Sequence, residues 1–106
     1  MPKYLLEVEY TLDGVRAVLA KGGSARRAAA ATAAKSVGGK LESFYFAFGG
    51  TDVYAVADLP DNTAAAAVAL AVSAGGHANV RTVVLLTPDE VDAAASKEVR
   101  YRPPGG

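Results

Sequence analysis

The sequence predicts a single α+β domain of 106 residues, built on an antiparallel sheet of four strands. Apolar and polar residues alternate over residues 4–11, which is typical of a strand with one buried face. Two alanine-rich stretches favour helices, because alanine has the highest helix propensity. Paired glycines and a Pro-Asp pair separate these segments and indicate where the elements end.

The first half of the chain is expected to fold as a strand, two consecutive helices and a second strand. Residues 4–11 form the first strand. Asp13 is a suitable N-cap for a short helix, and Ser24 for a longer helix over residues 25–37. The second strand covers residues 40–48.

The second half begins with a hairpin. Gly49 and Gly50 are predicted to form a two-residue turn, because such turns need positive φ angles. The third strand then covers residues 51–59. Asp61 is the expected N-cap of a helix over residues 62–74.

A fourth strand is expected over residues 79–87, followed by a last helix. Thr87 is placed to cap this helix, Pro88 suits its first position, and Glu90 completes a capping box. The chain ends in the extended segment VRYRPPGG. Residues 1–88 are therefore predicted as the α+β domain, and residues 89–106 as a C-terminal helix and tail.

The predicted order, βαββαβ, is that of the ferredoxin-like fold. Its antiparallel sheet has the strand order 4-1-3-2, with both main helices on one face. A two-residue hairpin would place Phe46 opposite Val53 and Tyr45 opposite Tyr54. The side chains expected to face the helices are Phe44, Phe46, Phe48, Val53, Ala55 and Ala57.

The opposite face of the sheet is unusually apolar for a surface in contact with water. The expected members are Leu5, Ser43, Tyr45, Ala47, Asp52, Tyr54, Val56, Asp58, Arg81, Val83 and Leu85. Exposed patches of this kind often mark an interface. We expect the same face of a second chain to cover it, which would give a homodimer with a partly polar space between two stacked sheets. The alternative is that the C-terminal helix folds back over its own sheet.

One charged constellation is expected at an edge of this open face. The strand order should bring Glu9, Asp52 and Arg81 together, with His77 in a nearby loop. Two neighbouring carboxylates raise the pKa of one of them, whereas a nearby guanidinium lowers the pKa of both. The group is either a salt-bridge network at a dimer interface or the mouth of a ligand site.

Composition excludes several classes of function. The chain has no cysteine, which excludes disulfides, cysteine-ligated zinc and thiol nucleophiles. Eleven basic and eleven acidic residues give no net charge, so nucleic-acid binding is not expected. His77 is the single histidine, which excludes a His-pair metal site, and we expect no metal and no cofactor. The N-terminus lacks a signal-peptide layout and no segment is long enough to span a membrane, so we expect a cytoplasmic protein without a membrane partner.

The segment KGGSARR offers a second candidate site. Flexible glycines, a helix start, and Lys21, Arg26 and Arg27 would suit an anion. Its spacing matches neither a P-loop nor a dinucleotide fingerprint. The favoured interpretation is a break between two helices with solvated arginines.

The chain resembles the GYD-domain family over nearly its whole length. The resemblance rests on GGKLESFYFAFGGTDVYAVADLPD, the alanine-rich helix after it, and LLTPDEVDAAASKEVRYRPPG. Gly50, Thr51 and Asp52 match the Gly-Tyr-Asp signature, with threonine in place of the tyrosine, so no role that needs an aromatic hydroxyl is expected at that position. The resemblance implies a ferredoxin-like protein related to the dimeric α/β-barrels, with no established activity.

The predicted function is a homo-oligomeric protein that binds a small organic ligand or metabolite at the open face of the sheet. The expected ligand-binding residues are Glu9, Tyr45, Asp52, Tyr54 and Arg81. One alternative is a cofactor-independent oxygenase or isomerase of the dimeric α/β-barrel type, for which Glu9, Asp52 and His77 are the candidate catalytic residues. The other alternative is a purely structural subunit.

Overall fold

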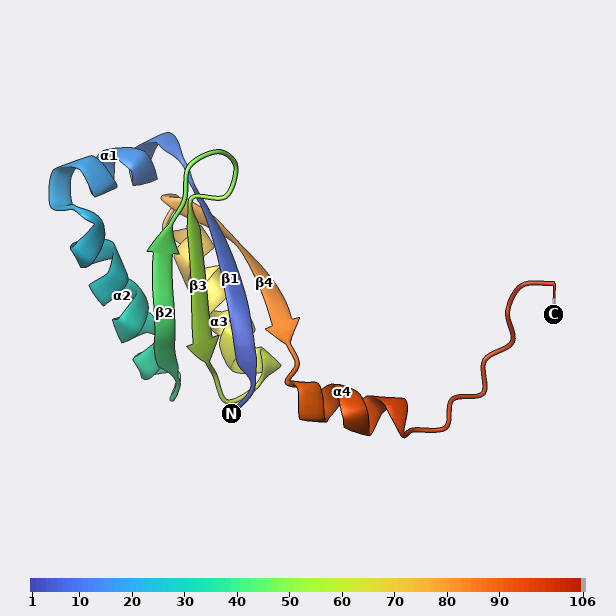
Figure 1. Ribbon diagram of the computed structural model, residues 1–106. Coiled ribbons are helices and arrows are strands. Elements are labelled where there is room, and N and C mark those ends of the chain that lie inside the picture. The colour runs from blue at the N-terminus through green and yellow to red at the C-terminus, as the bar shows by residue number, and fades with distance from the viewer. Residues whose placement is uncertain (106) are drawn as a thin grey trace.

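A four-stranded antiparallel sheet forms the centre of the protein in the computed structural model, which describes residues 1–105. The strands are β1 (Lys3–Tyr10), β2 (Lys40–Phe46), β3 (Val53–Asp58) and β4 (Ala78–Leu85). They lie in the order β2-β3-β1-β4 (Figure 1). Read from the other edge, this is the order 4-1-3-2.

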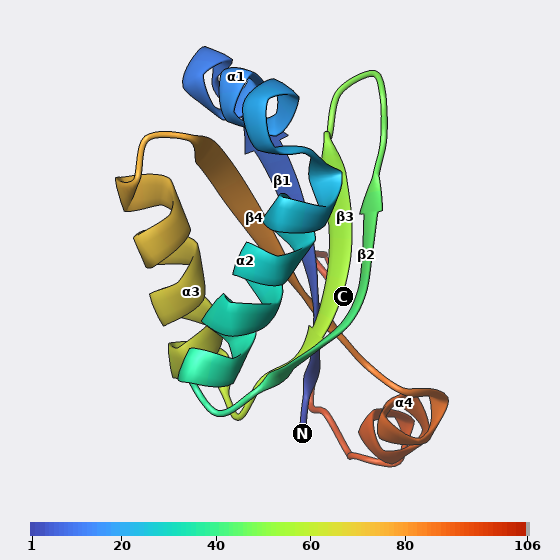
Figure 2. The ribbon, with the colours of Figure 1, turned by 90° about the vertical axis from the view of Figure 1, so that its left-hand side faces the viewer.

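Three helices connect the strands and a fourth follows the sheet. They are α1 (Leu12–Lys21), α2 (Gly23–Ser36), α3 (Asn62–Ala74) and α4 (Pro88–Ala95). As Figure 2 shows, α2 and α3 lie on the same face of the sheet, as the sequence predicts, and α1 lies across one end. Within the described residues the protein is therefore an α+β structure with an open sheet that is covered on one face.

The packed core lies where β1 begins and α2 ends. Tyr4, Ala34, Ala57, Leu59 and Ala65 form one buried cluster. The hydroxyl of Tyr4 lies 2.6 Å from the side-chain oxygen of Asn62, to which it donates a hydrogen bond. Burial of apolar side chains at this end holds β1, α2 and the start of α3 together.

The β2–β3 hairpin has the predicted register but not the predicted turn. Phe46 pairs with Val53 and Tyr45 with Tyr54, as expected. The strands end there, and one more backbone hydrogen bond joins the Ala47 amide to the Asp52 carbonyl. Residues 48–51 between them form a loop in which Gly49 and Gly50 have φ angles of 116° and 133°. This loop carries Phe48 into solvent, where its side chain is fully exposed, so the expectation that Phe48 faces the helices is wrong.

Two helix starts also differ from the prediction. Thr11, not Asp13, caps α1, because the Thr11 side chain accepts a hydrogen bond from the Gly14 amide. The helix α2 begins at Gly23, two residues before the predicted start at residue 25, because Gly22 with a φ angle of 85° separates it from α1. The predicted Asp61 cap of α3 is confirmed, and so is the capping box of Thr87 and Glu90 on α4.

The helix α4 and the residues after it extend away from the sheet (Figure 1). None of the α4 residues is buried. The alternative in which the C-terminal helix covers its own sheet is therefore wrong for this chain, and the open face stays uncovered. Over the described residues, none of the helices combines the length and apolar character needed to cross a membrane.

Candidate functional site

A cavity of about 520 Å³ lies between the sheet and the helices α2 and α3. This is the helix-covered face, not the open face on which the sequence predicts a ligand. The cavity exists because the helix residues that point toward the sheet are small. Ala29, Ala30 and Ala33 of α2 line it, where larger side chains would fill the space between the layers.

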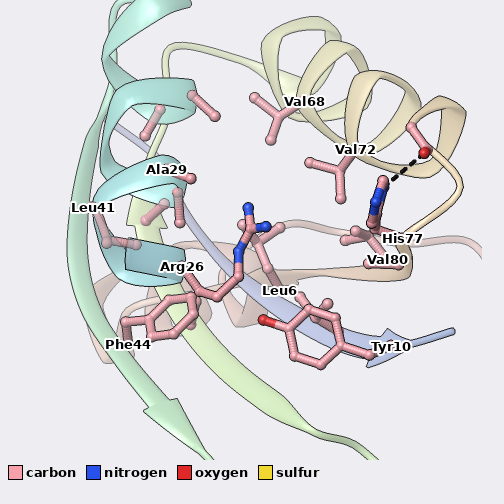
Figure 3. A pocket seen from close by; sticks show the side chains of 18 of the residues that line it. Leu6, Tyr10, Arg26, Ala29, Leu41, Phe44, Val68, Val72, His77 and Val80 are labelled. Atoms are coloured by element: carbon pink, nitrogen blue, oxygen red, sulfur yellow. Dashed lines mark hydrogen bonds between the residues drawn. The ribbon is translucent and has the colours of Figure 1, made fainter. Parts of the chain in front are cut away.

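Most of the cavity wall is aliphatic or aromatic. The sheet contributes residues from all four strands, and α3 contributes two valines (Figure 3). The apolar lining residues outside α2 include Leu6, Val8, Leu41, Phe44, Ala55, Ala57, Val68, Val72 and Val80. A wall of this kind suits the apolar body of an organic molecule.

Four polar side chains line the cavity at one end of the sheet. Tyr10 is the last residue of β1, Lys21 ends α1, Arg26 lies in the first turns of α2, and His77 precedes β4. The topology brings them together because β1 ends and β4 begins at the same end of the sheet, where Tyr10 pairs with Ala78. Figure 3 shows the Arg26 guanidinium reaching into the cavity, with the Tyr10 hydroxyl on the side of Arg26.

Tyr10 is held by its neighbours on both sides. Its ring packs against Phe46 with a centroid separation of 6.5 Å. Burial raises the pKa of the Tyr10 phenol above its usual value, Arg26 opposes this change, and Asp52 adds to it. The hydroxyl therefore stays protonated at neutral pH and can donate a hydrogen bond.

His77 belongs to the same end of the cavity. Its Nδ1 atom lies 2.8 Å from the carbonyl oxygen of Gly75 (Figure 3). Because a carbonyl can only accept, Nδ1 carries the hydrogen, which leaves Nε2 as the other polar atom of the ring. The sequence places His77 beside Glu9, Asp52 and Arg81, whereas the structure places it with Tyr10 and Arg26.

Asp52 has a structural partner. Its Oδ2 atom accepts a hydrogen bond of 2.8 Å from the backbone amide of Tyr10. The ladder between β1 and β3 ends at Val8 and Val53, so this amide has lost its strand partner. The carboxylate replaces that partner, which explains an acidic residue at the head of a strand.

Glu9 and Arg81 do lie together on the open face, but without Asp52. They line a second hollow of about 220 Å³ together with Glu7, Gly50, Thr51 and Asn79. The Arg81 guanidinium lies 3.7 Å from a carboxylate oxygen of Glu7, its direct neighbour across β1 and β4. The expected group of three is therefore corrected: Glu7 is the ionic partner of Arg81, and Asp52 is bonded to the main chain.

Tyr45 and Tyr54 form the predicted cross-strand pair on the open face. Their side chains are exposed, that of Tyr45 by 70%. They are far from the polar end of the large cavity, since they lie on the opposite side of the sheet from the residues that line it. In the single chain they form part of the exposed open face.

Sequence reasoning missed Tyr10 and the role of Arg26. The alternation over residues 4–11 predicts only a strand position for Tyr10, and the favoured interpretation of KGGSARR leaves Arg26 in solvent. The detectable signal was the spacing of small residues after Arg26, since positions 26, 29, 30, 33 and 34 share one helix face. Across residues 1–105, no three histidine, aspartate or glutamate side chains are grouped so as to hold a metal ion.

Comparison with known proteins places the chain in a family. No curated protein and no solved structure matches it. A family model described as the GYD domain matches residues 4–95, which include all four strands and the helices that connect them. Because the match covers most of the 106 residues, this chain belongs to the GYD-domain family.

Proposed function

We propose that this protein binds a small organic molecule in the cavity between its sheet and the helices α2 and α3. The observation that carries the proposal is the combination of a cavity of about 520 Å³, an apolar wall and polar groups gathered at one end. Binding sites for small molecules commonly have this size and this distribution of groups. The proposal moves the ligand from the open face, where the sequence predicts it, to the face under the helices.

A binding protein is supported better than the two alternatives. An oxygenase or isomerase that uses Asp52 as a base would need a free carboxylate, whereas Asp52 is engaged by the Tyr10 amide. A purely structural subunit would have no use for an unfilled cavity, because each void costs packing energy.

The experiment compares two substitutions on α2 that add the same side chain. Ala33→Leu occupies part of the cavity, since Ala33 lines it. Ala28→Leu is the matched control, because Ala28 is exposed on the same helix and does not line the cavity. The probe is the neutral fluorophore phenylnaphthylamine, whose emission rises when it enters an apolar site.

Three results are expected. The wild-type protein and Ala28→Leu bind the probe with similar affinity, and Ala33→Leu binds it at least about tenfold more weakly because the space is occupied. Ala33→Leu also unfolds at the same or a higher temperature than Ala28→Leu, since it removes a void. Equal probe binding by both variants would show that the probe does not use this cavity and would overturn the proposal.

We further propose that the protein is a homo-oligomer in which a second copy covers the open face of the sheet. Within residues 1–105, two exposed surfaces are candidates for contact with a partner. One is the open face, with Tyr45, Tyr54 and Val83 exposed. The other is the C-terminal arm, defined as residues 88–105, with Val91, Val99 and Tyr101 exposed.

Charge supports a second copy as the partner of both surfaces. Acidic side chains lie along the open face, including Glu7 and Glu9 beside Arg81. The arm carries Arg100 and Arg102 close to its end. An arm that crosses to a neighbouring chain could bring these guanidinium groups to the carboxylates, which would fix the orientation of the pair.

A further inference from the structure

The described side chains that line the polar end of the cavity include two cations and no acidic group, and the nearby Asp52 carboxylate is bonded to the Tyr10 amide behind that lining. Among the described residues that line the cavity, Lys21 and Arg26 are cationic, and none is an aspartate or a glutamate. The whole chain has equal numbers of acidic and basic residues. The charged side chains that line this otherwise apolar cavity are nevertheless all basic. Such a site favours a ligand of the opposite sign.

Arg26 is the group that most needs a counter-charge. Its side chain is half-buried and points into the cavity (Figure 3). Within residues 1–105, the ion pairs of the protein use Lys3 and Arg81 as their cations, and Arg26 forms none. A guanidinium that is partly removed from water without a partner gains more from an incoming anion than a solvated one does.

Tyr10 supplies a second donor beside Arg26. A phenol is protonated at neutral pH, and burial raises the pKa of this one further. The hydroxyl lies on the side of the Arg26 guanidinium in the cavity. A guanidinium and a phenol together match the two oxygens of a carboxylate, which accept hydrogen bonds and donate none.

The remaining wall defines the rest of the molecule. Beyond the polar end, the cavity is bounded by alanine, valine, leucine and phenylalanine side chains. A second charged group on the ligand would be buried there without a partner, at a high cost. The chemistry of the site therefore distinguishes one end of its ligand from the other.

From these observations we infer that the ligand is an organic monoanion: an apolar body in the cavity with one carboxylate held by Arg26 and Tyr10. This inference rests on the proposed function, since it names the chemical class of the molecule that the same cavity binds. It also gives Arg26 a specific role, in place of the solvated helix break that the sequence favours.

The test compares two probes of the same shape that differ in charge. Naphthoate carries the carboxylate, and naphthamide is its neutral counterpart. Binding is measured by titration calorimetry on the full chain at neutral pH. We expect the wild-type protein to bind naphthoate roughly ten- to a hundredfold more tightly than naphthamide, which is the usual effect of a charge-assisted pair.

Arg26→Gln should remove most of this preference and leave naphthamide binding nearly unchanged. Arg27→Gln is the matched control. It removes the same charge from the next residue, whose side chain is exposed and does not line the cavity. Arg26→Lys keeps the charge but loses the planar fork, so it should retain only part of the preference. Tyr10→Phe should weaken naphthoate by about tenfold at most, because it removes one neutral donor.

The outcomes separate this inference from the proposed function. Equal affinity of the wild-type protein for the two probes would overturn the inference alone, because the cavity would still bind. An equal loss in Arg26→Gln and Arg27→Gln would also overturn it, since the attraction would then come from the general surface charge. If neither probe binds, or if Ala33→Leu leaves both affinities unchanged, the cavity is not the site and both proposals fail. A folded Arg26→Gln protein is verified by its thermal unfolding.

Discussion

At the scale of single residues, Asp52 shows how one hydrogen bond can explain a sequence feature that suggests catalysis. An acidic residue between a glycine pair and an apolar strand is a plausible base or ligand. In the structure its carboxylate satisfies the Tyr10 amide at the point where β1 leaves its β3 partner. The same contact positions Tyr10, whose ring lines the cavity, so Asp52 acts on the candidate site through Tyr10.

Replacing Asp52 tests this structural role. Asp52→Ala leaves the half-buried Tyr10 amide without an acceptor and should lower the free energy of unfolding by about 1–3 kcal/mol. Asp52→Asn keeps an acceptor oxygen and should lose less. Urea denaturation measures both. Asp13→Ala is the control, because Asp13 is exposed and does not provide the cap of α1; a loss in Asp13→Ala as large as that in Asp52→Ala would contradict the assignment.

Tyr10 should make the protein sensitive to alkaline pH. Its pKa is raised in the folded state above the usual 10.0, so the phenol of the unfolded chain ionises first as the pH rises. The free energy of unfolding should therefore be intact below about pH 10 and fall as the pH climbs from there to the folded-state pKa. Tyr10→Phe lacks this contribution. Denaturation of both proteins at about pH 8 and about pH 11 should show the larger alkaline loss in the wild type, and equal losses would contradict the burial of this hydroxyl.

At the scale of elements, the junction of α1 with the loop before β4 is closely packed. The Thr11 amide donates to the His77 carbonyl and the Thr11 hydroxyl donates to the Gly76 carbonyl. Gly14 is buried on the first turn of α1 against the same loop. This close approach fixes where His77 stands relative to Tyr10, and so it shapes the polar end of the cavity.

Gly14→Ala should be destabilising although alanine favours helices. A Cβ atom at this position would collide with the backbone carbonyl oxygen of His77, which cannot move aside as a side chain could. We expect a loss of about 1–3 kcal/mol, as for other overpacked sites. Gly75→Ala is the control, because its nearest atom would lie at 3.4 Å and its φ angle of −69° suits alanine. The unfolding temperatures of the two variants test this prediction. A stabilised Gly14→Ala protein would show that residue 14 and the His77 carbonyl are less closely packed than described.

At the scale of the whole molecule, the C-terminal arm is separate from the body of the fold. The radius of gyration is 16.8 Å, whereas a compact chain of this length has about 13 Å. The difference comes from α4 and the residues after it, which extend past the sheet (Figure 1). An extended arm and an uncovered sheet face on one chain are the two features that the proposed second copy would satisfy together.

Removal of the arm tests the proposed assembly. A chain that ends after Leu86 should keep its sheet and its unfolding temperature at equal monomer concentration, because α4 has no buried residue. Its self-association should weaken by roughly tenfold or more, since exposed aromatic and arginine anchors are lost. Light scattering and sedimentation measure this. The full-length double substitution Arg100→Glu with Arg102→Glu should weaken association in the same direction through charge alone, and a wild-type chain that remains a monomer would refute the proposal.

Local and periodic features of this protein are determined by its sequence. The βαββαβ order, the Asp61 cap, the capping box of α4 and the pairing of Tyr45 with Tyr54 all follow from short-range patterns. Each depends on residues within a few positions of one another or on the two-residue period of a strand. The predictions at Asp13 and Ser24 are wrong because a neighbouring residue, Thr11 or Gly22, sets the start of the helix. The prediction at Phe48 is wrong because the strand ends before the glycine pair.

Only the tertiary structure decided where the candidate site lies. The cavity depends on the distance between two layers, which is set by side chains from every strand and from α2 and α3 together. The same alanines could have allowed close packing or left a void, and local propensity does not distinguish these outcomes. Likewise, the partner of Asp52 is an amide forty-two positions away, which became free only because the ladder between β1 and β3 ends at Val8.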